Sequence, residues 1–104
     1  MSDILYPQDA GELADLIETE RSLVVKFTAP SWCAPCRQFA PHFEAASTRT
    51  DVTFVSVDID DHDWAVVDYK VQGVPTVQFY ENGQYVRDLR ERTAPRLLSE
   101  INNA

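Results

Sequence analysis

Two cysteines, Cys33 and Cys36, are the residues of this sequence best suited to chemistry. They are the only cysteines in the 104-residue chain, and two residues separate them. A strand gives way to a helix here, so Cys33 would occupy the helix N-terminus, whose free N–H groups and dipole stabilise an anion. The thiolate is the attacking species in disulfide exchange. Cys36, one turn further on, is close enough to form a short disulfide and should be the more buried sulfur. The spacing therefore predicts an attacking thiol and a resolving thiol.

Metal binding and a purely structural disulfide are the alternative uses of this pair. A zinc site needs about two further ligands, and the other soft or nitrogen donors are His42 and His62. His42 falls about half a turn around the helix from Cys33, so it should not converge with the cysteines. The acidic stretch 58–63 lacks the glycine and the glutamate of an EF-hand loop, which predicts a solvated loop. An inert disulfide would close too short a loop to stabilise the chain much. We therefore expect no metal site.

Composition narrows the function further. The chain is 44% hydrophobic and 25% charged, which is typical of a soluble globular protein, and its length predicts a single domain over residues 1–104. Nine Lys and Arg against 17 Asp and Glu give a net charge of -8, which argues against nucleic-acid binding. No stretch is long and apolar enough to span a membrane, and the N-terminus does not resemble a targeting signal. We expect a cytoplasmic monomer.

Hydrophobic periodicity predicts strands and helices that alternate along the chain. Strands are expected at 2–6, 23–28, 52–59, 76–80 and 85–89, and helices at 7–20, 33–48, 63–69 and 94–102. Asn82-Gly83 is typical of a two-residue hairpin turn, and Pro41 should kink the second helix. This order predicts an α/β fold whose sheet is parallel at first and ends in an antiparallel hairpin.

Several separated motifs, in order, resemble the thioredoxin family over nearly the whole chain. They are Phe27-Thr28-Ala29, Trp32-Cys33-Ala34-Pro35-Cys36, Pro41, Val57-Asp58-Ile59-Asp60, Val71-Gln72-Gly73-Val74-Pro75-Thr76 and Asn82-Gly83. The resemblance implies a thioredoxin fold, with a central mixed β-sheet flanked by helices on both faces. It also implies a disulfide reductase with no bound cofactor beyond its own redox-active disulfide. Its partners would be disulfide-containing proteins and thioredoxin reductase or a similar dithiol donor.

The resemblance also implies a role for each residue of the site. Cys33 resembles the nucleophile that forms a mixed disulfide with the substrate, and Cys36 resembles the resolving thiol. Pro75 resembles the cis-proline that faces the cysteines, Val74 would offer backbone groups to an extended substrate segment, and Trp32 would flank that segment. A partly exposed surface aromatic and a simple strand-entry proline are the alternatives for Trp32 and Pro75.

The residues between the cysteines bear on the direction of the reaction. Pro35 precedes the second cysteine, as in reducing thioredoxins, whereas oxidising or isomerising relatives often have histidine there. The resemblance therefore favours reduction. Ala34 departs from the glycine usual in the family, which should shift the reduction potential modestly.

Lys26 is a more unusual departure, because it stands where the family has a buried acid that helps to move the proton of the second cysteine. Strand alternation places it on the face of Val24 and Thr28, which a helix should cover. It either reaches solvent or pairs with Asp58, or it tunes the thiol pair, because a nearby cation favours a thiolate. The lysine common near the family's acid is also absent, since Ser56 replaces it. Asp58 is a further candidate for tuning.

Two more departures lie beside the predicted site. Pro30-Ser31 adds a residue before Trp32, and the run Leu89-Arg90-Glu91-Arg92 replaces a glycine usual beside the substrate groove. The charged run either alters the choice of partner or is a solvated loop. These departures keep open a second class of function, a thioredoxin-fold binding module or a subunit of a larger complex, with redox activity secondary.

Overall fold

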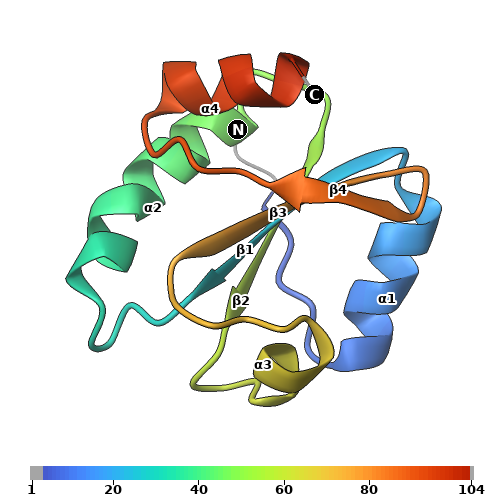
Figure 1. Ribbon diagram of the computed structural model, residues 1–104, viewed down its shortest axis with the longest axis vertical. Helices are drawn as coiled ribbons and strands as arrows, with labels where there is room; N and C mark the ends of the chain where they lie inside the picture. The colour runs from blue at the N-terminus through green and yellow to red at the C-terminus, as the bar shows by residue number, and fades with distance from the viewer. Residues whose placement is uncertain (1–3, 104) are drawn as a thin grey trace.

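A four-stranded mixed sheet organises the fold of the computed structural model, which describes residues 4–103 (Figure 1). The strands lie in the order β2-β1-β3-β4 and comprise β1 Ser22–Thr28, β2 Thr53–Asp58, β3 Thr76–Glu81 and β4 Gln84–Asp88. β1 and β2 are parallel, whereas β3 is antiparallel to both β1 and β4. The predicted hairpin is confirmed, since Asn82 and Gly83 both have positive φ, of 53° and 80°, as a two-residue turn requires.

Helices cover both faces of the sheet, as predicted. They are α1 Ala10–Thr19, α2 Ala34–Ser47, α3 Trp64–Asp68 and α4 Ala94–Asn102. α2 and α4 lie on one side of the sheet, and α1 and α3 lie on the other (Figure 1). Alternate residues of β1 supply the two cores: Val24 packs with Phe39 and Phe43, and Val25 packs with Leu13. The alternation fixes β1 as the centre of the fold and places its C-terminal end beside the start of α2.

The N-terminal segment differs from the prediction. Within the described part of the predicted strand 2–6, only Leu5 makes a bridge, to Val55; residues 2 and 3 lie outside the described residues. Pro7 follows closely and has no N–H for a further ladder bond, which ends the pairing. The helix expected from residue 7 begins at Ala10, because the side chain of Asp9 accepts the N–H of Glu12 at 2.8 Å and caps it.

The remaining boundaries agree with the prediction to within one or two residues. α2 continues through Pro41, and the kink expected there stays a prediction. Among residues 4–103, no helix combines the length and the apolar character needed to cross a membrane.

Candidate active site

The cysteine pair lies at the point where β1 ends and α2 begins. The Ala29 carbonyl accepts the N–H groups of Trp32, at 3.2 Å, and Cys33, at 2.9 Å, which forms the tight connection between the two elements. Cys33 is the N-cap of α2, and its Sγ accepts the backbone N–H of Cys36 at 3.2 Å. The two cysteines form a disulfide with a Cα–Cα distance of 5.2 Å. Cys33 is 5% exposed and Cys36 is 0% exposed, so the predicted order of burial is confirmed.

The loop before β3 faces the disulfide. The Val74–Pro75 peptide bond is cis, as the family resemblance implied. The Val74 carbonyl oxygen lies 3.6 Å from Cys33 Sγ, and the Val74 side chain packs against the small cluster of Ala29 and the two cysteines. The sheet therefore brings together two segments about 40 residues apart in the sequence, and a backbone carbonyl meets the sulfur at their junction.

Trp32 is 61% exposed beside the disulfide, and its indole is held in place by a residue that the sequence analysis did not single out. Asp60 accepts a hydrogen bond from Trp32 Nε1 at 3.1 Å through one carboxylate oxygen, and from Ser31 Oγ at 2.8 Å through the other. The extra residue of the Pro30-Ser31 segment is thus anchored to the loop after β2. Neither spacing nor composition links residues 31 and 60, so only the fold reveals this contact.

Lys26 lies on the helix-covered face, as predicted, but its acidic neighbour differs from the expected one. It is 7% exposed, and its Nζ lies 4.7 Å from the centre of the Phe43 ring. Burial lowers the pKa of Lys26, and the carboxylate of Glu44 opposes that shift. Asp58 is out of register with Lys26, which pairs with Ser56 in the sheet. The carboxylate of Asp58 instead accepts the N–H of Asp60 at 2.9 Å.

Arg92 is a second residue that the sequence analysis placed only within a charged run. Its Nη2 donates to the Pro75 carbonyl at 3.4 Å, and its guanidinium lies 5.1 Å from the centre of the Phe39 ring. Arg92 is partly buried, whereas Arg90 is exposed. Of the two alternatives for the charged run, a solvated loop does not describe Arg92, which is partly buried beside Pro75 and Phe39.

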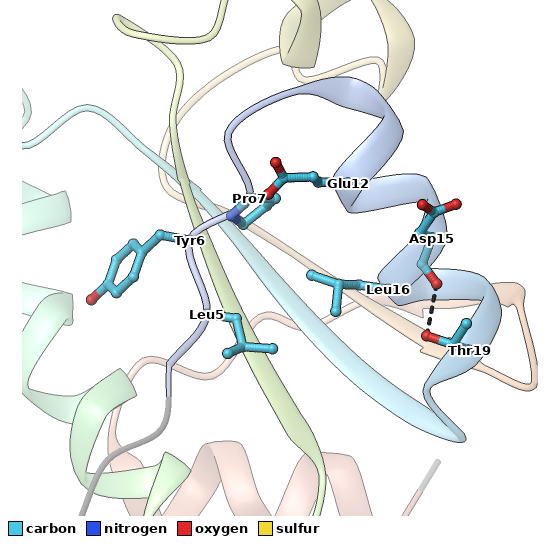
Figure 2. A pocket seen from close by; sticks show the side chains of 7 residues that line it. All are labelled: Leu5, Tyr6, Pro7, Glu12, Asp15, Leu16 and Thr19. Atoms are coloured by element: carbon cyan, nitrogen blue, oxygen red, sulfur yellow. Dashed lines mark hydrogen bonds between the residues drawn. The ribbon is translucent and has the colours of Figure 1, made fainter.

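A separate hollow lies on the α1 side of the molecule, and Figure 2 shows its lining. Leu5 and Tyr6 come from the N-terminal segment, while Glu12, Asp15 and Leu16 come from α1. It contains none of the residues around the disulfide. Over residues 4–103, no group of three or more His, Cys, Asp or Glu side chains is arranged to hold a metal ion.

Comparison with known proteins places this geometry in a family. Residues 8–103 match the family model described as thioredoxin. The chain belongs to the thioredoxin family. Thioredoxin-2 of Dictyostelium discoideum is 38% identical over 85% of this chain and 99% of its own length. The thioredoxin of Mycoplasmoides gallisepticum is 39% identical over 71% of this chain and 74% of its own length. Solved thioredoxins share the fold. That of Schistosoma mansoni is 30% identical, with a TM-score of 0.85 over 98% of each chain. That of Plasmodium falciparum is 27% identical, with a TM-score of 0.83 over 96% of this chain and 98% of its own.

Membership of the thioredoxin family, together with the close cysteine pair, makes this protein a thiol–disulfide oxidoreductase. It reduces protein disulfides by dithiol exchange, and disulfide-containing proteins are its substrates. The second class of function, a binding module with redox activity secondary, is not favoured by these relatives.

Proposed function

We propose that Cys33 is the nucleophile and Cys36 the resolving thiol of the exchange reaction. The supporting observation is the contrast between the two sulfurs. Cys33 caps α2, accepts the Cys36 N–H and lies beside the Val74 carbonyl, whereas Cys36 is fully buried. In the reduced protein, the helix N-terminus favours a thiolate at Cys33. A bulky substrate disulfide reaches the more exposed sulfur first.

The reaction balances over two exchanges. The Cys33 thiolate attacks one sulfur of the substrate disulfide, forms a mixed disulfide and releases the other substrate sulfur, which takes up a proton. The Cys36 thiol then loses its proton and attacks Cys33 Sγ. That step forms the Cys33–Cys36 disulfide and releases the second substrate thiolate, which is also protonated. Two electrons pass from the cysteine pair to the substrate, whose two new thiols take up one proton from Cys36 and one from solvent.

Trp32, Val74 and Pro75 form the proposed substrate-binding surface. An extended substrate segment would lie along the loop before β3, where the Val74 carbonyl lies 3.6 Å from Cys33 Sγ. The exposed indole of Trp32, fixed by Asp60, would flank the segment on the other side of the sulfur. Hydrogen bonds to main-chain groups supply affinity, and any preference among substrate side chains must come from neighbouring pockets.

The rest of the catalytic cycle requires a source of electrons. We propose that thioredoxin reductase or a similar dithiol donor reduces the Cys33–Cys36 disulfide, and that no other cofactor is bound. We further propose that residues 1–104 act as one domain and as a monomer, in the cytoplasm. Pro35, in the first turn of α2, supports reduction as the favoured direction.

Catalytic reduction of a protein disulfide tests this function. With excess dithiothreitol as donor, small amounts of wild-type protein should accelerate reduction of a disulfide-containing protein, and Cys33→Ser should abolish the acceleration. The reason is that the nucleophile is lost while the fold remains. Circular dichroism should confirm that the variant is folded. Equal acceleration by Cys33→Ser would contradict the assignment of the nucleophile.

Lys26, Pro35 and Asp58 are the proposed tuning residues, and Lys26 gives the sharpest test. Its ammonium lies over the rings of Phe39 and Phe43, and Phe43 is seven residues, a rise of ~10 Å, beyond Cys36 along α2. At an effective dielectric constant of ~20, a charge at that distance favours a thiolate by about 1–2 kcal/mol. Lys26→Met should therefore move the midpoint of the alkylation rate against pH upward by about one unit.

Asp58→Asn provides the matched control for Lys26→Met. Removal of a negative charge should move the alkylation midpoint in the opposite direction, because an anion near the site disfavours a thiolate. If both variants give the wild-type profile, Lys26 and Asp58 are structural residues and the tuning proposal is wrong.

A further inference from the structure

A small pocket opens beside the disulfide and combines hydrogen-bond donors with apolar walls. It has a volume of about 280 Å³, and its walls are Pro35, Phe39 and Pro75. Pro35 lies between the two cysteines, and Pro75 follows the carbonyl that faces Cys33. The remaining lining residues are Gln38, His42 and Arg92. The pocket therefore lies next to the place where a substrate disulfide must sit.

The guanidinium of Arg92 is held by carbonyl oxygens. Its Nη1 donates to Leu89 at 2.9 Å and to Glu91 at 3.1 Å, and its Nη2 donates to Pro75 at 3.4 Å. Among residues 4–103, these bonds use three of the five N–H donors of the guanidinium. The side chain is thus fixed in position against Phe39, with donors left for a ligand.

The nearby acid Glu100 is engaged elsewhere. Its carboxylate accepts the backbone N–H groups of Arg90, at 2.9 and 3.0 Å, and of Glu91, at 3.0 Å, and so holds the charged loop on α4. Burial lowers the pKa of Arg92, while the charges of Glu100, Asp88 and Glu91 oppose that shift. The guanidinium of an arginine stays protonated whichever of these two effects is larger. A partly buried cation whose hydrogen bonds go to neutral carbonyls is a good partner for a carboxylate.

Gln38 and His42 add donors from the helix. They are four residues apart on α2, so their side chains lie on the same face, and both are exposed. An amide and an imidazole can each donate a hydrogen bond. The neighbouring cation Arg37 points elsewhere, since its Nη1 donates to the Pro30 carbonyl at 2.7 Å. The basic character of the pocket therefore depends on Arg92.

We propose that Arg92, assisted by Gln38 and His42, binds a carboxylate of the substrate close to the reacting disulfide. This inference rests on the proposed function and deepens it. The protein would reduce disulfides with Asp or Glu near the attacked cysteine faster than otherwise identical disulfides with Asn or Gln. The chain as a whole carries a net charge of -8, which would repel an acidic substrate. The preference for a carboxylate must therefore come from the pocket itself.

Peptide disulfides that differ in one residue test the proposal. Each pair of peptides, amidated at the C-terminus, carries Glu or Gln at one position within three residues of the reacting cysteine. For the best position, the wild type should show a kcat/KM about tenfold higher for Glu than for Gln, as expected for a charge-assisted bond at a half-exposed site. A third peptide, with Gln and a free C-terminal carboxylate, shows whether a chain end serves as well as a side chain.

Three variants distinguish the pocket from general electrostatics. Arg92→Gln should remove the preference for Glu, whereas Arg90→Gln, which changes the net charge equally at an exposed neighbour, should keep it. Arg92→Lys should retain only part of the preference, because lysine keeps the charge but lacks the fork geometry. Circular dichroism checks the fold of each variant.

The outcomes separate failure of the pocket from failure of the function. Reduction of every Glu and Gln pair at equal rates by the wild type would overturn the pocket proposal and leave the reductase intact. A preference that Arg90→Gln also removes would overturn it too, because the net charge would then be its source. No reduction of any peptide or protein disulfide would instead contradict the proposed function.

Discussion

Replacement of Cys36 by serine should turn this reductase into a trap for its substrates. Cys33 would still attack, but the mixed disulfide would lack its resolving thiol. An intramolecular thiol held in position has an effective concentration many orders of magnitude above that of millimolar dithiol in solution. Turnover should therefore fall by about 100-fold or more. A covalent one-to-one complex should accumulate between the reduced variant and a protein with one internal disulfide.

Intact-mass spectrometry under non-reducing conditions measures that complex directly. Both substrate sulfurs stay in one chain, so the adduct should have the summed mass of the two proteins, and excess dithiol should release it. Cys33→Ser is the matched control and should form no adduct, because Cys36 is 0% exposed. Capture of substrate by Cys33→Ser, with none by Cys36→Ser, would reverse the two roles.

Lys26→Met should stabilise the fold near neutral pH. The lysine is 7% exposed, and its ammonium lies over the faces of Phe39 and Phe43. Its attraction to Glu44 and to the two rings stabilises the folded state, whereas the loss of hydration destabilises it. Replacement of a buried ion by an apolar side chain of similar volume is often neutral or stabilising by about 1–4 kcal/mol. Urea unfolding of the oxidised proteins measures the difference.

The pH dependence of that difference has a definite sign. Burial lowers the pKa of Lys26 in the folded state below its ordinary value of 10.5. Between those two values the unfolded chain binds more protons, so the stability contributed at this site rises with pH. The advantage of Lys26→Met should be fully present below the lowered pKa and should shrink as the pH approaches 10.5. A variant less stable than the wild type by more than about 1 kcal/mol would mean that the ring and Glu44 contacts outweigh desolvation.

The elements around the site could be predicted because each has a local cause. The alternation of Leu23, Val24 and Val25 fixes the two faces of β1, and Asn82-Gly83 fixes the hairpin. Over residues 4–6, the predicted N-terminal strand is reduced to the bridge between Leu5 and Val55, because Pro7 has no N–H to continue the pairing. A short apolar run does not reveal how many of its residues will find a partner.

The sequence by itself determined the chemistry of this protein. The spacing of Cys33 and Cys36 at the start of a helix predicts two thiols of unequal burial and reactivity. Both the burial and the reactivity follow from local geometry. The tertiary structure decided what surrounds those thiols. It placed Val74 against Cys33, Asp60 on Trp32 and Arg92 on Pro75, across 41, 28 and 17 residues of sequence. Such contacts depend on strand register and loop path, which no short-range pattern encodes. The structure also placed Lys26 beside Phe43 and Glu44, because alternation along β1 puts it on the face that α2 covers.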